Sequence, residues 1–143
     1  MAAQLFDPTT PFGQRVARRL DTEPVIWLTS VGQDGTPQPN PVWFLWEGDS
    51  FVVYSAGSAH RNLHVRQRPR VSLHFDSDGK GSDIVVFLGT AEPADDLRSS
   101  DQNRDYQAKY GESIRRGPWK TAERFDRDYP VKLRIRVERI RGW

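Results

Sequence analysis

Short apolar segments with strand-like composition recur along this 143-residue chain, separated by turns rich in Gly, Asp and Ser. They predict six strands, over residues 25–31, 38–47, 51–55, 71–75, 84–92 and 129–140. In the last strand Val131, Leu133, Ile135 and Val137 alternate with charged residues, which is typical of a strand buried on one face. Residues 42–46 are all apolar, which indicates burial on both faces.

Helical patterns lie before and between these strands. Residues 12–20 carry apolar side chains at helical spacing and predict a short amphipathic helix. A second short helix is expected after Ser58 as N-cap, with Pro69 limiting its far end. A third is expected from Asp95 or Asp96 to residue 110, where Gly111 would stop it, followed by a weaker helical pattern over 112–127.

Strands joined by hairpin turns, with helices only at intervals, predict a mainly β fold. We expect one domain over residues 1–143, with 1–10 as a loose N-terminal arm, built as a six-stranded antiparallel barrel with short flanking helices. The interior of so small a barrel is filled by its own side chains. A ligand is therefore expected outside the barrel or between two subunits.

Composition excludes several classes of function. The chain has no cysteine, which excludes disulfides, thiolate metal sites and thiol nucleophiles. Its 21 Lys and Arg nearly balance 19 Asp and Glu, and they are scattered, so we expect no nucleic-acid partner. The start of the chain does not resemble a signal peptide, and no apolar run approaches membrane-spanning length. We expect a cytoplasmic protein with no membrane partner.

Self-sufficient catalytic motifs are also lacking. His60 and His64 have the i, i+4 spacing of helical zinc ligands, but no glutamate or third ligand accompanies them, so we expect no metal site. There is no G-x-S-x-G elbow and no glycine-rich nucleotide loop. We therefore expect no catalytic side chain, and an enzyme built on this chain would need a cofactor for its chemistry.

The segment after the third strand is the strongest candidate for binding. Hydroxyls at Ser55 and Ser58, backbone N–H groups at the start of a helix and the guanidinium of Arg61 could together hold an anion. The alternative interpretation is a helix start that caps itself with serine and exposes a solvated arginine. Local features alone leave both open.

The order of five motifs supplies a resemblance. Residues 35–44 read GTPQPNPVWF, followed by Tyr54-Ser55, by HRNL at 60–63, by RPRVSL at 68–73 and by the tail 127–143. In this order they resemble the pyridoxamine 5′-phosphate oxidase-like split β-barrel flavoproteins. More narrowly they are similar to the actinobacterial branch that uses the deazaflavin coenzyme F-420. The likeness covers residues 12–143.

This resemblance implies a homodimer with two cofactor sites at the subunit interface. It implies that Asn40, Pro41, Val42 and Trp43 run beside the deazaflavin ring and that Tyr54 and Ser55 lie near the cofactor side chain. The phosphate-binding turn would comprise Ser58, Ala59, His60, Arg61 and Asn62, with Arg61 as its cation, and Trp143 would come from the partner subunit. Relatives often carry lysine where Ala59 stands, which leaves F-420 and FMN both open as cofactors.

The implied activity is hydride transfer between F-420 and a small organic acceptor of the quinone, enone or tetrapyrrole type. Two alternatives remain at this point. One is a non-catalytic protein that binds flavin, deazaflavin or haem. The other is an FMN-dependent enzyme like pyridoxamine 5′-phosphate oxidase itself.

Overall fold

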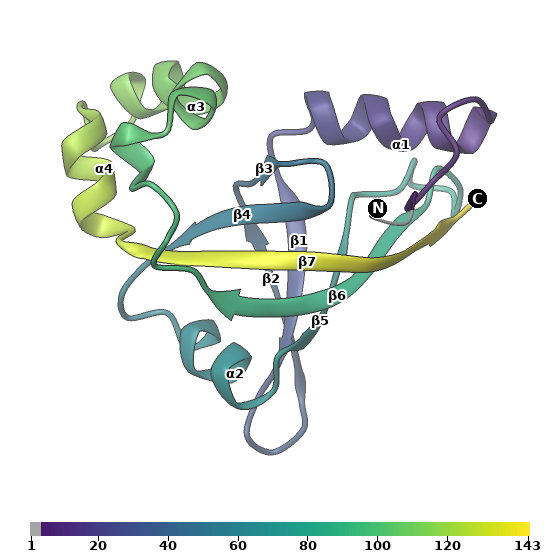
Figure 1. The fold of residues 1–143 in the computed structure, drawn as a ribbon, viewed down its shortest axis with the longest axis horizontal. Helices are drawn as coiled ribbons and strands as arrows, with labels where there is room; N and C mark the ends of the chain where they lie inside the picture. Colours follow the sequence, from purple (N-terminus) through teal and green to yellow (C-terminus); the bar gives the residue numbers. More distant parts are fainter. Residues whose placement is uncertain (1–3) are drawn as a thin grey trace.

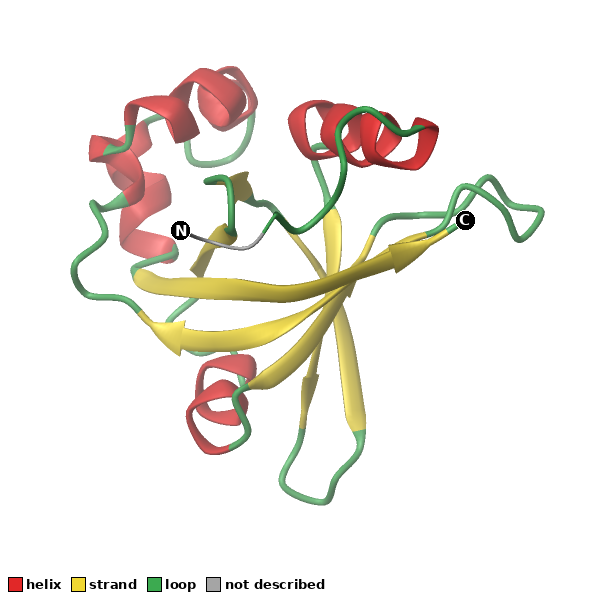
Figure 2. Ribbon diagram, turned by 45° about the vertical axis from the view of Figure 1, so that its right-hand side comes forward, coloured by secondary structure: helices red, strands yellow, loops and turns green. Residues whose placement is uncertain are grey.

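The computed structural model describes residues 4–143 as one antiparallel sheet that curls into a half-barrel, with helices around it (Figures 1 and 2). The strand order is β2-β1-β5-β6-β7-β4-β3. The strands are β1 (Ile26–Val31), β2 (Pro37–Val42), β3 (Leu45–Trp46), β4 (Ser50–Ser55), β5 (Arg70–His74), β6 (Val85–Pro93) and β7 (Val131–Gly142). This confirms the predicted split-barrel fold.

The helices lie at the ends and rim of this curled sheet. They are α1 (Pro11–Thr22), α2 (Arg61–Gln67), α3 (Arg104–Arg116) and α4 (Ala122–Asp128), with a 3₁₀ turn η1 (Ser100–Gln102). Figure 1 shows α3 and α4 grouped beyond the start of β7, whereas α1 lies near its other end. The short helix α2 sits apart, on the side of the sheet toward which the β1–β2 hairpin turn projects.

The sheet has seven strands rather than six, because the predicted strand 38–47 is interrupted. Trp43 and Phe44 leave the sheet between β2 and β3. The Phe44 N–H donates to the Tyr110 hydroxyl at 2.9 Å, and the Phe44 carbonyl accepts from Lys109 Nζ at 2.9 Å. Side chains of α3 thus satisfy the backbone groups that a neighbouring strand would otherwise pair.

Two predicted helix boundaries are wrong. Helix α2 begins at Arg61, its N-cap residue is His60, and no side chain caps it, so Ser58 is not the N-cap. Helix α3 begins after Asn103, whose side chain accepts from the Tyr106 N–H, and it continues through Gly111. The real cap lies eight residues beyond Asp95, and burial of the helix face outweighs the weak propensity of one glycine.

The barrel core is aliphatic with phenylalanine, as the alternation in the last strand predicts. Leu133, Ile135 and Val137 are buried in it, while Arg134 on the opposite face of β7 pairs with Asp96. A second buried cluster under α3 and α4 is instead rich in tyrosine and tryptophan. The two clusters divide the molecule into a barrel half and an aromatic, helix-covered half.

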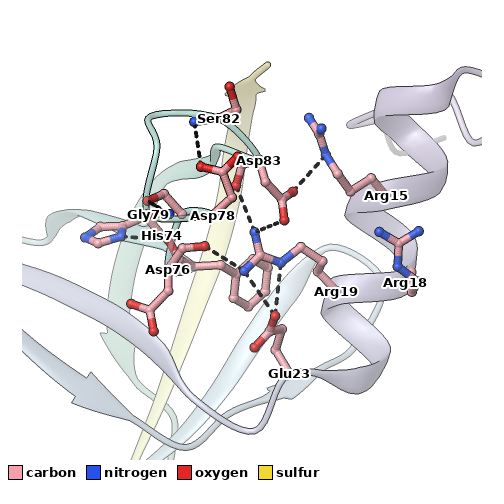
Figure 3. Close-up of polar contacts among 12 residues, drawn as sticks. Arg15, Arg18, Arg19, Glu23, His74, Asp76, Asp78, Gly79, Ser82 and Asp83 are labelled. Carbon is pink, nitrogen blue, oxygen red and sulfur yellow. Dashed lines mark hydrogen bonds and ion pairs between the residues drawn. The ribbon is translucent and has the colours of Figure 1, made fainter.

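Helix α1 is anchored to the barrel by a buried arginine (Figure 3). The Arg19 guanidinium donates to the carbonyls of Asp76 and Asp83 at 2.7 and 2.9 Å and pairs with the carboxylates of Glu23 and Asp83. Its carbon lies 4.9 Å from the centre of the Phe75 ring. Of the expected arm, residues 1–3 lie outside the described residues, and Leu5 and Phe6 pack against the core.

The edge strand β2 carries prolines at alternate positions, 37, 39 and 41, opposite Val31, Thr29 and Trp27 of β1. A proline cannot donate to a ladder, so in a paired edge strand it occupies positions whose N–H side faces outward. The alternate residues Gln38 and Asn40 therefore make the backbone pairing to β1, and the opposite border of β2 is open.

Candidate functional site

A partly buried arginine occupies the turn between β4 and α2. Arg61 Nη1 donates to the Ser55 hydroxyl at 3.0 Å, and Ser55 is completely buried. Within residues 4–143 no carboxylate lies at ion-pair distance from Arg61. Burial away from water lowers the pKa of the Arg61 guanidinium. A desolvated cation without a carboxylate partner is a place where an external anion gains the most.

Part of the expected cradle of backbone N–H groups is used within the turn itself, whereas the N–H groups of Ser58, His60 and Arg61 have no partner among residues 4–143. The amides of Ala59, Asn62 and His64 donate to carbonyls within the same turn, at 3.1 Å each. Asn62 also donates from its side chain to the Ala56 carbonyl at 2.7 Å, which fixes the turn's shape. Ser58 is exposed.

A polar pocket opens beside Arg61. Its volume is about 450 Å³, and its lining comprises Ser30, Gln38, Asn40, Ala59, His60, Arg61 and His64. The residues come from β1, β2 and the start of α2, three segments that the sheet topology brings together. Four of the residues predicted from the sequence thus share one pocket, and Arg61 supplies its lasting positive charge.

An aromatic cleft of about 410 Å³ lies on the other side of Arg61. Five of the predicted residues line it: Pro41, Val42, Trp43, Tyr54 and Arg61. The others are Val25 from the segment before β1 and Tyr106, Trp119, Phe125 and Tyr129 from the helical region. Arg61 lines both spaces, so the site has a polar half and an aromatic half that meet at one guanidinium.

Packing fixes the aromatic side chains of the cleft. The Trp43 ring stacks on Tyr110, with centroids 4.4 Å apart and planes 4° apart, and on Phe125 at 5.5 Å. The Tyr54 hydroxyl donates to the Arg98 carbonyl at 2.7 Å and accepts from Asn103 Nδ2 at 3.1 Å. Burial raises the pKa of Tyr54, so its hydroxyl stays neutral. The cleft therefore presents a rigid apolar wall.

Sequence reasoning missed the contribution of the helical region. Tyr106 is completely buried, and its hydroxyl has no hydrogen-bond partner in the part of the chain that the structure describes. Trp119, Phe125 and Tyr129 pack on one another around it. Their clustering within one polar segment was a signal, but only the fold shows that this segment returns to the end of β2.

Trp143 is not brought to this site within one chain. Its indole N–H donates to the Gly81 carbonyl at 3.0 Å, beside Ile84, and 64% of the residue is exposed. Figure 1 shows the C-terminus at the end of β7 opposite to α4. Contact with a cofactor would therefore require the Trp143 of a second subunit, which stays a prediction.

Other features of the molecule lie apart from this site. Another cavity, of about 560 Å³, lies between α1 and α3 and contains none of the predicted residues. Among residues 4–143 no group of three His, Asp or Glu side chains is placed to hold a metal ion. Over the same residues no helix has the length and apolar character needed to cross a membrane.

Comparison with family models matches residues 12–143 to the model described as "Pyridoxamine 5′-phosphate oxidase". No curated protein matches the chain. A solved structure from Listeria innocua, provisionally named pyridoxamine 5′-phosphate oxidase, has 25% identity and a TM-score of 0.63, with 90% of this chain and 94% of that chain covered.

Two further solved structures have the same fold. An F-420 reductase has 19% identity and a TM-score of 0.66, with 87% of this chain and 94% of that chain covered. A FAD-binding protein from Mesorhizobium loti has 24% identity and a TM-score of 0.63, with 89% and 88% covered. At these identities the likeness extends to the fold.

Proposed function

Because this chain belongs to the pyridoxamine 5′-phosphate oxidase family, we propose that it is an oxidoreductase that binds coenzyme F-420 and transfers a hydride to a small organic acceptor. The observation that carries the proposal is Arg61, a partly buried cation with one serine as its protein partner and with a pocket on either side. An F-420 reductase is among the solved structures that share the fold of this chain.

The residues present suit an anionic, flat cofactor. A phosphate at the polar half would meet Arg61, whose planar fork of donors matches phosphate oxygens, together with the neutral donors Gln38 and Asn40. The ring would follow β2 from Asn40 toward Trp43, where the wall becomes aromatic. The polar half of the site would thus hold the phosphate of the cofactor, and the aromatic half would hold its ring.

Bound F-420 supplies the hydride chemistry itself. The chain's task is then to bind the tail, to orient the ring and to keep water from its reactive face. Packed rings perform the last two tasks: Trp43 is fixed by Tyr110 and Phe125, and its position does not depend on a ligand. We assign no side chain to proton transfer.

The acceptor proposed for this site is planar and largely apolar, because the cleft wall consists of aromatic rings. A homodimer completes the proposal, with Trp143 of the second subunit closing the exposed side of the ring. Trp143 follows β7 with 64% of its surface exposed, so it is accessible for such a contact.

Titration with F-420 tests the proposal, with binding followed by quenching of tryptophan fluorescence. We expect Arg61→Gln to weaken F-420 binding about 100-fold, since a charge-assisted contact is worth roughly 1.5–3 kcal/mol. Arg66→Gln, an exposed position on the same helix, is the matched control and should bind as the unmodified chain does. Equal binding by Arg61→Gln and Arg66→Gln would contradict the site.

A second candidate function is non-catalytic binding of a flavin or deazaflavin. Ala59 favours it, because the turn has no second cation with a permanent charge at that position. Turnover separates the two: reduced F-420 should be oxidised on addition of a quinone, an enone or a tetrapyrrole only if the protein is an oxidoreductase. Tight binding with no oxidation by any acceptor would support the second candidate.

A further inference from the structure

We infer that His60 and His64 are anion-binding residues that complete the positive charge around Arg61 when they are protonated, so that affinity for an anion at this site rises as pH falls. The inference deepens the proposed function, because it rests on the same polar pocket. It assigns a role to two side chains for which the proposed hydride chemistry has no use.

The fold places both imidazoles at the pocket. His60 immediately precedes α2 and His64 lies one turn along it, and both line the pocket together with Arg61. Their ring centroids are 6.4 Å apart. An anion of phosphate size has several oxygens, so within this pocket it can accept from more than one of these donors.

Ser30 orients one of the rings. This buried residue of β1 places its hydroxyl 3.4 Å from His64 Nδ1. Over residues 4–143 the other nitrogen of His64 has no hydrogen-bond partner, and neither does either nitrogen of His60. These nitrogens remain available as donors, and a protonated imidazole has a donor on each.

The charges around the rings favour an anion from solution over an internal partner. From the strands, Ser30, Gln38 and Asn40 face the pocket and are neutral, and β6 contributes no lining residue. The Asp34 carboxylate in the β1–β2 turn accepts from the Thr36 N–H at 3.0 Å, and over residues 4–143 it makes no ion pair with either histidine. Arg66 and Arg68 add positive charge farther along α2 and at its end.

Imidazole gains its charge between about pH 5 and 8, unlike guanidinium, which is always charged. The pocket therefore contains one permanent cation and two conditional ones. Position 59, where relatives often have lysine, is alanine in this chain, so it contributes no positive charge to the turn. A second positive charge beside that of Arg61 can then come from the histidines, and only when they are protonated. Binding of an anion whose own charge is constant should then depend on pH through these two residues.

Inorganic sulfate is a suitable probe, because it stays a dianion from pH 5.5 to 8.0. Isothermal titration calorimetry on the full chain should give a sulfate affinity at least about tenfold tighter at pH 5.5 than at 8.0. His60→Gln and His64→Gln should each reduce this ratio, and the double variant should bring it close to one. Circular dichroism at both pH values verifies that each variant is folded.

His74 supplies the matched control. It lies on β5, outside the pocket, with its Nδ1 3.1 Å from the Phe75 carbonyl and its ring stacked on Trp27. His74→Gln should keep the full pH ratio. An unchanged ratio in the His60/His64 double variant, a lost ratio in His74→Gln, or no sulfate binding at either pH would each overturn the inference. Failure of F-420 to bind a protein that binds sulfate in this way would instead overturn the proposed function.

Discussion

Two arginines are withdrawn from water in this molecule, and the protein treats them in opposite ways. Arg19, only 7% exposed, has two backbone carbonyls, two carboxylates and the face of an aromatic ring around its guanidinium (Figure 3). Arg61 has a single serine hydroxyl. The first arrangement satisfies the cation from within the chain, whereas the second leaves its donors unfilled beside two pockets.

The contrast teaches how to tell a structural cation from a binding one. Burial alone does not distinguish them, because both side chains lose water. The distinction lies in whether acceptors within the chain replace that water. Arg19 joins α1 to the loop before β6 and stabilises the fold. Burial of the unpaired Arg61 guanidinium carries a desolvation penalty in the folded chain, and a bound anion would offset that penalty.

The largest effect is expected from Arg19→Met. This change leaves the Glu23 carboxylate without its cation, the Asp83 carboxylate with Arg15 alone, and two carbonyls without a donor, so we expect a loss of about 2–3 kcal/mol of unfolding free energy. Urea denaturation measures it. Arg18→Met, exposed on the same helix, is the control and should change stability by less than about 0.5 kcal/mol. Equal effects of the two changes would break the contrast.

An internal carboxylate beside Arg61 should pair with its guanidinium, as Glu23 and Asp83 pair with that of Arg19. Ser55→Asp places a carboxylate beside the guanidinium, and we expect F-420 affinity to fall about 30-fold, because the cation is then neutralised from within. Ser55→Asn has nearly the same size without the charge and should retain most of the affinity. The comparison is made by fluorescence titration, and a similar loss in both variants would attribute the effect to crowding.

Removal of Arg61 should have little effect on stability. We expect Arg61→Met to change the unfolding free energy by less than about 1 kcal/mol, since an unpaired, desolvated guanidinium contributes little to the folded state. Urea denaturation beside Arg19→Met gives the direct contrast. A loss as large as that of Arg19→Met would show that Arg61 is a structural residue after all.

Lys109 lies between these two cases, and its effect is expected as a change of stability with pH. It donates to the Phe44 carbonyl and lies 3.6 Å from the centre of the Phe44 ring, yet burial lowers its pKa to about 8 from 10.5. Between these values the unfolded chain binds more protons than the folded one, so stability should rise with pH from 8 to 10.5.

Lys109→Met should remove this rise, as measured by urea denaturation at several pH values. Lys80→Met, in the exposed loop before β6, is the control and should keep the profile of the unmodified chain. If the Lys109→Met profile stays parallel to that of the unmodified chain, burial of Lys109 does not disfavour its charge.

The strand pattern could be predicted from sequence because it is local. Alternation over 131–137 fixes which face of β7 is buried, and the order of motifs predicts the turn that contains Arg61. The interruption at Phe44 could not be predicted, since its backbone partners come from α3, more than 60 residues away. The start of α3 was also missed, because Asn103 and Asp95 are equally plausible caps until the fold decides which helix face is buried.

The candidate site divides in the same way. Residues that adjoin one another in sequence, such as 40–43 and 59–61, were predicted together and line neighbouring spaces. The aromatic wall, from Tyr106 to Tyr129, was not predicted as part of the site. Its place beside Trp43 depends on how α3 and α4 return to the sheet. Arg61 also has no carboxylate partner among residues 4–143. This depends on the tertiary structure, so a local sequence pattern could not predict it.

The prolines of β2 have a consequence for how this protein meets other chains. With Pro37, Pro39 and Pro41 on its outward side, the free border of the sheet offers carbonyl oxygens and no amide hydrogens. An approaching strand would find half of the ladder missing, so the sheet cannot grow by templated addition at the β2 edge, the usual first step toward fibrils. At this border a second copy of the chain can therefore associate only through side-chain surfaces, and a flat molecule that lies along it is favoured if it can donate hydrogen bonds.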